Sequence, residues 1–378
     1  KGVTGRIYFD EHGNAMKPFP FGVYLQSKLI SAPIQLKPIV NPEAIADLDK
    51  KLEEGNILVI DDHFMYKTTV IYTGIDINEL SNIDSRNGTF SADFYLWFRH
   101  RGSLDYSKIE FLNAAKDIHL NDAIMEMDID AVSYSAYRVK GDFQEAFTFR
   151  DYPFDSQTLS IRFRHKNLDS NRLLFVADDI GMQRDGGKAP VESPIKHSIL
   201  DPAGEWHLQD VLVFSDISAT DSTLGNPRMF HPTADTDIGY SRFNLVTEIQ
   251  RNAKSYALKN LIPLFIIILL GYAMLFVSPQ GPPFVARMNL GVTALLTAIL
   301  LSIKTAGQLP NIGYLVAIDY IYFATYALIL SGIVISVAEL IANLRSKDIL
   351  ATRLELFGRV FQPFFLFAAI GIFIYLYA

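Results

Sequence analysis

The feature that most constrains this chain is a series of four long apolar segments that begins after residue 255. A helix needs ~20 apolar residues to cross the hydrocarbon core of a bilayer. The segments run over about 257–277, 288–307, 315–343 and 357–377, whereas the chain before residue 255 is mixed and polar. The sequence therefore predicts a transmembrane region of four helices over 256–378, preceded by a large polar region.

Positive charge predicts the orientation of these helices. The connection between the third and fourth segments carries Arg345, Lys347, Arg353 and Arg359, and Arg287 follows the short first connection. Loops rich in Lys and Arg tend to stay on the cytoplasmic side. We therefore expect a multi-pass protein of the cell (inner) membrane, with both connections inside the cell and the N-terminal region extracellular or periplasmic.

The polar region has the residue pattern of β-strands. The stretches at 89–98, 158–165 and 243–250 are β-prone or alternate between apolar and polar residues, and turn-forming residues precede the first of them. Several such strands without long helical periods favour an antiparallel β-sandwich over 64–255. The exposed helix that the sequence supports in this part is 43–54, after Pro42 and before Gly55.

Composition excludes several classes of function. The chain has no cysteine, so neither a disulfide nor a thiolate metal site can form, and its net charge of −7 disfavours nucleic acid as a partner. It also contains no HExxH, GxSxG or Gly-rich phosphate loop. The sequence thus predicts that the protein is not an enzyme and has no cofactor.

The second apolar segment is unusually polar for a membrane anchor. Steps of four and three residues place Asn289, Thr293, Leu296, Leu300 and Ile303 on one helical face, which is polar at the inner end and apolar toward the outer end. Such a face can be an ordinary helix interface built from small and hydroxyl residues. It can also line a pore, where rings of Leu and Ile close the path by dewetting. The second interpretation requires an oligomer, because one copy encloses no pore.

Four motifs together resemble the pentameric ligand-gated ion channels, the Cys-loop receptor superfamily, in its bacterial branch. They are YPFDSQ (152–157), Pro263 in the first segment, ARMNLGVTALLT (286–297) and LPNIGYLVAID (309–319), and the similarity covers about Tyr66 to Ala378. The resemblance implies an extracellular β-sandwich that binds an agonist, and a homopentameric pore lined by the second helix. At the two positions of the family's disulfide, this chain has Glu145 and Leu159. In lacking the disulfide, the chain resembles the bacterial members.

The resemblance also implies how binding is coupled to the pore. The YPFD loop, with Tyr152, Pro153, Phe154 and Asp155, would press on the outer ends of the helices. Phe154 would insert among the helix ends, and Asp155 would pair with Arg251, which occupies the place of the family's arginine before the first helix. The opposing surface would be the link 307–314, stiffened by Pro310.

The inner mouth of the predicted pore bears on ion selectivity. Leu296, Leu300 and Ile303 are candidate gate residues, and Ala286, Arg287 and Lys304 are candidates for charge selectivity. Cation channels of the family usually carry a glutamate at this mouth, whereas here no acid lies between Pro279 and Asn311. Anion or weakly selective conduction is slightly favoured. The alternatives are cation selectivity and a non-conducting, membrane-anchored receptor.

The agonist site is less well defined. Arg164, His165 and Lys166 follow the strand 158–165 and favour an anionic or zwitterionic small molecule, although the same residues can be an ordinary solvated loop. Calcium modulation is a further option because hard cations bind clustered oxygens. The acids concerned are Asp178, Asp179, Asp235 and Asp237.

Residues 1–63 lie outside the part that resembles the family. They read as a short pair of hairpins, and they are similar to the C-terminal strands of bilobal periplasmic amino-acid-binding proteins. They are then either the tail and linker of an upstream binding domain or an N-terminal extension that packs on the sandwich.

Overall fold

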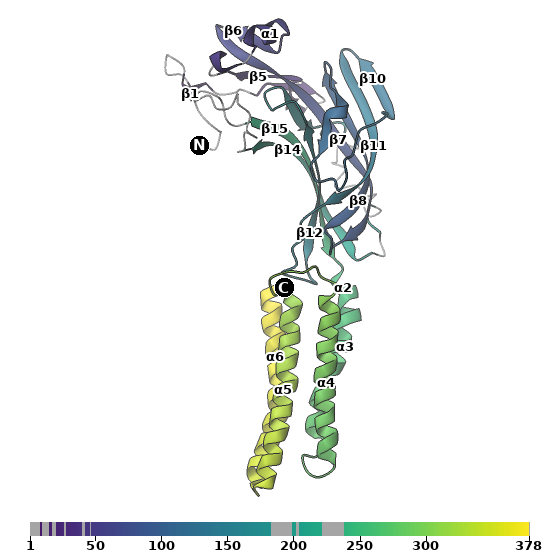
Figure 1. Cartoon of the computed structure of the whole chain (residues 1–378), viewed down its shortest axis with the longest axis vertical. Helices are drawn as coiled ribbons and strands as arrows, with labels where there is room; N and C mark the ends of the chain where they lie inside the picture. The colour runs from purple at the N-terminus through teal and green to yellow at the C-terminus, as the bar shows by residue number, and fades with distance from the viewer. Residues whose placement is uncertain are drawn as a thin grey trace.

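The structure is a computed structural model of the chain. It describes residues 8–9, 15–16, 20–25, 28–39, 42–45, 47–182, 199–201, 204–220 and 238–377. The molecule is elongated, with β-sheets at one end and a bundle of long helices at the other (Figure 1). The last helix runs back toward the sheets, so the C-terminus lies at the junction between the two parts (Figure 1).

Two sheets form the sandwich. The first has seven strands in the order β10-β11-β8-β7-β13, and β5 and β6 also pair with β7. Its strands are β5 (Ile34–Pro38), β6 (Ile57–Ile60), β7 (His63–Asp84), β8 (Thr89–Arg101), β10 (Met125–Ile129), β11 (Val132–Gln144) and β13 (Leu173–Ala177). The second has the order β14-β15-β12-β9, with β9 (Ile109–Phe111), β12 (Ser156–His165), β14 (Trp206–Thr220) and β15 (Ile238–Arg251). Every pairing is antiparallel except β13 with β7.

The core between the sheets follows from the two-residue period of the strands. In β8 every second side chain is buried, beginning with Phe90 and ending with His100. Phe98 of this strand meets Phe163 of β12 edge-to-face, with ring centroids 6.1 Å apart. Phe163 in turn stacks on Phe243 of β15 at 5.1 Å. The predicted antiparallel sandwich is thus confirmed, and its strands are positioned by a continuous aromatic core.

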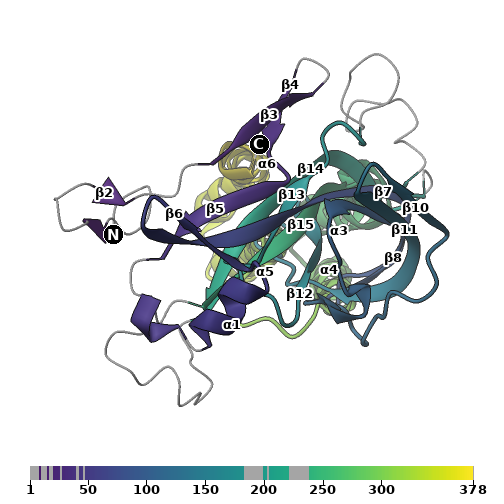
Figure 2. The ribbon, with the colours of Figure 1, turned by 90° about the horizontal axis from the view of Figure 1, so that it is seen from above.

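The N-terminal part contains the predicted pair of hairpins. β1 (Tyr8–Phe9) pairs with β2 (Ala15–Met16), and β3 (Gly22–Leu25) pairs with β4 (Lys28–Ser31). Both hairpins extend to the side of the sheets when the molecule is viewed along its long axis (Figure 2). β5 and β6, by contrast, pair with the first half of β7, so the part before residue 63 shares a sheet with the sandwich.

The predicted helix 43–54 is wrong in extent. The structure has a 3-10 turn, η1 (Pro42–Ala44), and a separate short helix, α1 (Leu48–Glu53). Asp47 lies between them with φ 58°, a left-handed conformation that cannot continue a helix. An amphipathic pattern does not reveal such a break.

The helical bundle contains four helices long and apolar enough to cross a membrane. The first is built from α2 (Ala253–Tyr256), a π-helical turn η6 (Ala257–Leu261), α3 (Ile262–Ala273) and a 3-10 turn η7 (Met274–Phe276). The others are α4 (Pro283–Ala306), α5 (Ala317–Leu344) and α6 (Asp348–Tyr377). The second and fourth begin earlier than predicted, because each helix extends through a charged residue, Arg287 or Arg353, at which the apolar pattern breaks off. The chain is a multi-pass membrane protein.

Two glycines allow α4 and α5 to pack closely against η7. A Cβ on Gly291 of α4 would lie 2.6 Å from Sδ of Met274, and a Cβ on Gly332 of α5 would overlap the Cε of the same methionine. Met274 is itself fully buried. This packing fixes which face of α4 turns toward the bundle and which face turns away.

Candidate pore and coupling interface

The predicted pore stripe lies on the face of α4 that turns away from the bundle. All five of its residues are exposed in the single chain. Leu296, Leu300 and Ile303 are 56%, 59% and 62% exposed, values that are high for large aliphatic side chains. Ala294 and Ala298, on the opposite face, are buried in a cluster with Ile267 of α3 and Ile329 of α5. The stripe is therefore available to other subunits, to water or to lipid.

Arg287 does not lie on this stripe. Its side chain is fully buried, its Nε donates to Ser336 Oγ at 2.8 Å, and its Nη1 donates to the Val277 carbonyl oxygen at 3.1 Å. Nη1 also lies 2.9 Å from a carboxylate oxygen of Glu339, another fully buried side chain. Because the guanidinium is inside the bundle and paired, it adds no free positive charge to the stripe. A role of Arg287 in charge selectivity stays a prediction, but it does not come from a free charge on the stripe.

The other two charge-selectivity candidates are both exposed. Ala286 lies in the first turn of α4, at the end of the bundle far from the sheets. Lys304 lies in the last turn of α4 and lines a cavity of about 1250 Å³ where the sheets meet the helices. The same cavity is lined by Arg86, Glu205 and Lys259. A role in selectivity remains a prediction for both residues.

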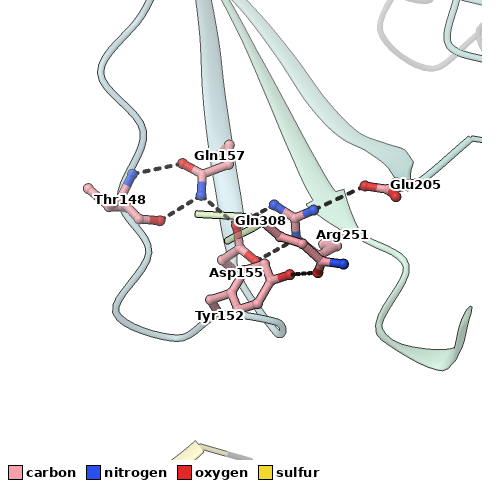
Figure 3. Close-up of polar contacts among 7 residues, drawn as sticks. All are labelled: Thr148, Tyr152, Asp155, Gln157, Glu205, Arg251 and Gln308. Atoms are coloured by element: carbon pink, nitrogen blue, oxygen red, sulfur yellow. Dashed lines mark hydrogen bonds and ion pairs between the residues drawn. The ribbon is translucent and has the colours of Figure 1, made fainter. Parts of the chain in front are cut away.

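The YPFD loop follows β11 and leads into β12, and its aspartate is paired as predicted (Figure 3). Asp155 is 3% and Arg251 8% exposed. Arg251 Nε donates to one carboxylate oxygen of Asp155 at 2.8 Å, and its Nη2 lies 3.3 Å from the other. The guanidinium also lies over the ring of Trp206, 4.2 Å from its centroid, and donates to Glu205 at 3.3 Å. Arg251 thereby joins the loop to the start of β14 and the end of β15.

The same loop contacts the helices. The Tyr152 hydroxyl donates to Oε1 of Gln308, just after α4, at 3.1 Å (Figure 3). Burial raises the pKa of Tyr152, so the hydroxyl keeps the proton that it donates. The Ile318 amide donates to the Tyr152 carbonyl at 3.2 Å. The Phe154 ring lies 5.9 Å from Phe373 of α6.

The link 307–314 also lies against the loop. Its Leu309 is buried in one cluster with Phe149 and Tyr152, and the hydroxyl of its Tyr314 accepts from the Phe149 amide at 3.1 Å. Pro310 is half-buried beside them. The coupling residues thus come together as predicted, while their role in gating stays a prediction.

Sequence reasoning missed Gln157, which closes the base of the loop. Its side-chain amide accepts from the Thr148 amide at 3.0 Å and donates to the Thr148 carbonyl at 2.6 Å (Figure 3). It also donates to Asp155 at 2.6 Å. The loop is held by these hydrogen bonds where the family would have a disulfide. At the family's disulfide positions, Glu145 instead accepts from Arg162, and Leu159 is buried.

Glu339 was missed as well. It is an acid deep in an apolar helix of 28 residues, and a charged residue inside a membrane segment is itself a signal of a specific partner.

The predicted ligand residues do not converge on one surface. Arg164 pairs with Glu110 at 3.2 Å and lies over the Tyr240 ring, 4.8 Å from its centroid. His165 is buried, and its Nδ1 accepts amide hydrogen bonds from the turn that follows it. Lys166 is exposed. Within this chain, only the lysine of the three stands free for a ligand.

The acids considered for calcium are not gathered in the described part of the chain. Asp178 is buried and accepts from Arg99 at 2.7 Å and from Trp97 at 3.1 Å. Asp235 and Asp237 lie outside the described residues. Among the residues that are described, no group of three or more His, Asp or Glu could hold a metal.

Comparison with known proteins finds a distant similarity over part of the chain. No protein-family model matches the chain. The chain is similar to the gamma-aminobutyric acid receptor subunit beta of Lymnaea stagnalis, with 27% identity over 105 residues. The match covers 28% of this chain and 21% of the relative's length. This distant similarity, together with the β-sandwich, the four apolar helices and the absence of cysteine, agrees with the resemblance to the pentameric ligand-gated ion channels without the disulfide.

Proposed function

We propose that five copies of this chain form a ligand-gated ion channel whose central pore is lined by α4. The observation that carries the proposal is the stripe of Asn289, Thr293, Leu296, Leu300 and Ile303, which is exposed while the opposite face of α4 is packed on α3 and α5. A helix that only anchors the protein in lipid has no use for polar residues on an exposed face. Around a five-fold axis, the same face becomes rings of amide and hydroxyl groups followed by rings of aliphatic groups.

The gate belongs to the aliphatic part of this stripe. Leu296, Leu300 and Ile303 would form narrow apolar rings, and such rings exclude water and ions when they are close together. Movement of the sandwich would reach them through the YPFD loop, because the loop contacts both the end of α4 and the start of α5. Agonist binding outside would then open the pore by shifting the link 307–314.

The proposed agonist is a small anionic or zwitterionic molecule. The relative is named as a receptor for gamma-aminobutyric acid, which is a zwitterion, and the exposed Lys166 provides a cation that would suit a carboxylate. For the permeant ion we propose anion or weakly selective conduction, with cation selectivity as the alternative. The pore helix contains no acid, whereas the chain as a whole is acidic.

The decisive experiment is ion flux through the purified protein in liposomes. Agonist candidates should evoke flux, and a non-conducting receptor would bind without producing any. The absence of native cysteine allows a second test in the same vesicles. Single cysteines at the five stripe positions should react with a water-soluble thiol reagent in the open channel, whereas cysteines at the buried Ala294 and Ala298 should not. Equal labelling of the two sets contradicts the proposed pore face.

A further inference from the structure

Two arginine–glutamate pairs lie at the end of the helical bundle far from the sheets, one of them buried and the other about one third exposed. Arg287 of α4 is paired with Glu339 of α5, and both side chains are 0% exposed. Arg359 of α6 is paired with Glu355, one helical turn earlier.

The surroundings of Arg287 hold it in one orientation. Ser336, on the same face of α5 as Glu339, accepts from its Nε at 2.8 Å. The Val277 carbonyl, at the end of the first transmembrane segment, accepts from its Nη1 at 3.1 Å. These two acceptors are neutral, so they aim the guanidinium without balancing its charge. Glu339 supplies that balance, because an unpaired buried charge is far more costly than a paired one.

The second pair cannot substitute for Glu339. Arg359 donates to the Leu275 carbonyl at 3.3 Å, lies over the Phe276 ring at 4.7 Å and is engaged by Glu355. Glu355 is therefore occupied with its own arginine. If Glu339 lost its charge, none of the remaining groups that the structure describes in contact with the Arg287 guanidinium would be a carboxylate.

We propose that Glu339 determines the charge selectivity of the channel by keeping Arg287 out of the ion pathway. This rests on the proposed pore along α4. Arg287 lies on the packed face of α4 with Gly291 and Ala294, but it is only in the second turn of the helix and directly follows the exposed Ala286. An arginine side chain is long enough to turn from an apolar site toward nearby water. Without Glu339, its guanidinium would enter the pore mouth, one per subunit, and form a positive ring.

The first test is Glu339→Gln, measured as the reversal potential of agonist-evoked current in a NaCl gradient. The chloride-to-sodium permeability ratio should rise by roughly tenfold, the lower end of the local ion enrichment that a cleft lined by one sign of charge produces. Ser336→Ala is the matched control, because it removes a contact to Arg287 but leaves the counter-charge in place. It should leave the permeability ratio unchanged.

Two further variants keep the proposal testable if Glu339→Gln fails to fold. Arg287→Gln should leave the permeability ratio at the wild-type value, because the guanidinium does not face the wild-type pore. The double variant Arg287→Gln/Glu339→Gln should also match the wild type, since it has no arginine to release. A merely structural role of Glu339 would change current size or yield, but not the ratio.

The outcomes separate this inference from the proposed function. Wild-type protein without agonist-evoked current overturns the channel itself. If the wild type conducts but Arg287→Gln has an altered chloride-to-sodium permeability ratio, the inference is overturned and the channel is not. The same holds if the shift of this ratio in Glu339→Gln persists in the double variant. An unchanged ratio in a conducting Glu339→Gln channel also overturns it.

Discussion

Arg251 contacts four other side chains where the sheets meet the helices. It donates to Asp155 and Glu205, and it lies over Trp206 and Tyr152, with its guanidinium 5.0 Å from the centroid of the tyrosine ring. Removing one partner of a buried ion pair costs more than the pair contributes, because the remaining charge stays desolvated. The residue is therefore placed where a small displacement of the YPFD loop has a large energetic effect.

A double-mutant cycle tests this pair at the residue scale. Asp155→Ala should destabilise the closed assembly or its gating by about 3–5 kcal/mol, the usual cost of leaving a buried charge unpaired. Arg251→Ala should have a similar effect, and the double variant should cost much less than the sum. The measurement is the agonist concentration–response relation together with thermal unfolding. Additive effects would mean that the two side chains are not coupled.

Glu205→Ala is the matched control for this cycle. Glu205 also contacts Arg251, but its side chain is 75% exposed. Solvent screens such a contact, so its loss should cost no more than ~1 kcal/mol.

Two buried histidines make the sandwich sensitive to acid. His100 lies 2.8 Å from the Tyr106 hydroxyl, and the Nδ1 of His165 accepts from the amides of Asn167 and Leu168. Burial lowers the pKa of both imidazoles, because a charged ring would lose its hydration. The unfolded chain, with pKa values of about 6.5, therefore binds more protons than the folded chain as the pH falls.

We therefore expect the thermal unfolding midpoint to drop as the pH falls below about 6.5. The variants His100→Gln and His165→Asn replace each imidazole by an amide that can take over its hydrogen bond but does not titrate. In the double variant, the unfolding midpoint should therefore depend less on pH in this range. Asp93 and Asp216 do not interfere, because ion pairs with arginine lower the pKa of these carboxyls and their contribution to stability is lost only as the pH falls to about 4 and below. A pH dependence that is the same in the double variant would contradict this assignment.

At the scale of elements, one prediction concerns the position of the proposed gate along α4. Leu296 lies near the middle of the helix and on the exposed stripe, so a serine there would wet the proposed constriction. Leu296→Ser should raise apparent agonist sensitivity by roughly tenfold, which corresponds to about 1.4 kcal/mol of closed-state stabilisation lost. Concentration–response curves and the leak without agonist give the measurement. If the variant behaves as wild type, the constriction lies at Leu300 or Ile303.

The elements that could be predicted are those whose pattern is local. Apolar length revealed the four transmembrane helices, and the alternation of Leu159, Ile161 and Phe163 revealed β12. The pairing of β5 and β6 with the first half of β7 has no such pattern, because it depends on residues far apart in sequence. The start of α6 at Asp348 was missed because its first turns are polar.

The candidate site divides in the same way. The α4 stripe follows from helical spacing alone, and the Asp155–Arg251 pair was found through a family resemblance. Gln157 and Glu339 could not be assigned from the sequence, since their importance comes from partners on other elements. The partners of Arg287 were missed for the same reason: a helical wheel places a residue on a face, but it does not show what packs there.

At the scale of the whole molecule, the sheets and the helices are joined by hydrogen-bonded backbone as well as by side chains. The Ala317 amide, at the start of α5, donates to the Arg150 carbonyl at 2.9 Å, and the next amide donates to Tyr152. Such bonds are short and directional. The YPFD loop therefore cannot move far without pulling on the connection between α4 and α5.

The orientation in the membrane is a prediction for the whole molecule. A cysteine at the exposed Ser103 of the sandwich should react with a membrane-impermeant thiol reagent applied to intact cells from which any outer barrier has been removed. A cysteine at Ser346, between α5 and α6, should react only after the membrane is opened, because the positive charges beside it favour the cytoplasmic side. The reverse pattern would invert the proposed topology.

The exposed stripe on α4 also bears on how such a protein is made. A newly inserted subunit has no neighbours, so Leu296, Leu300 and Ile303 face lipid tails, which solvate aliphatic groups without penalty. The polar Asn289 lies in the second turn of the helix, close to the headgroup layer, and Thr293 lies one turn further in. In the proposed channel, the surface that carries water after assembly is therefore the one that lipid covers in the single subunit.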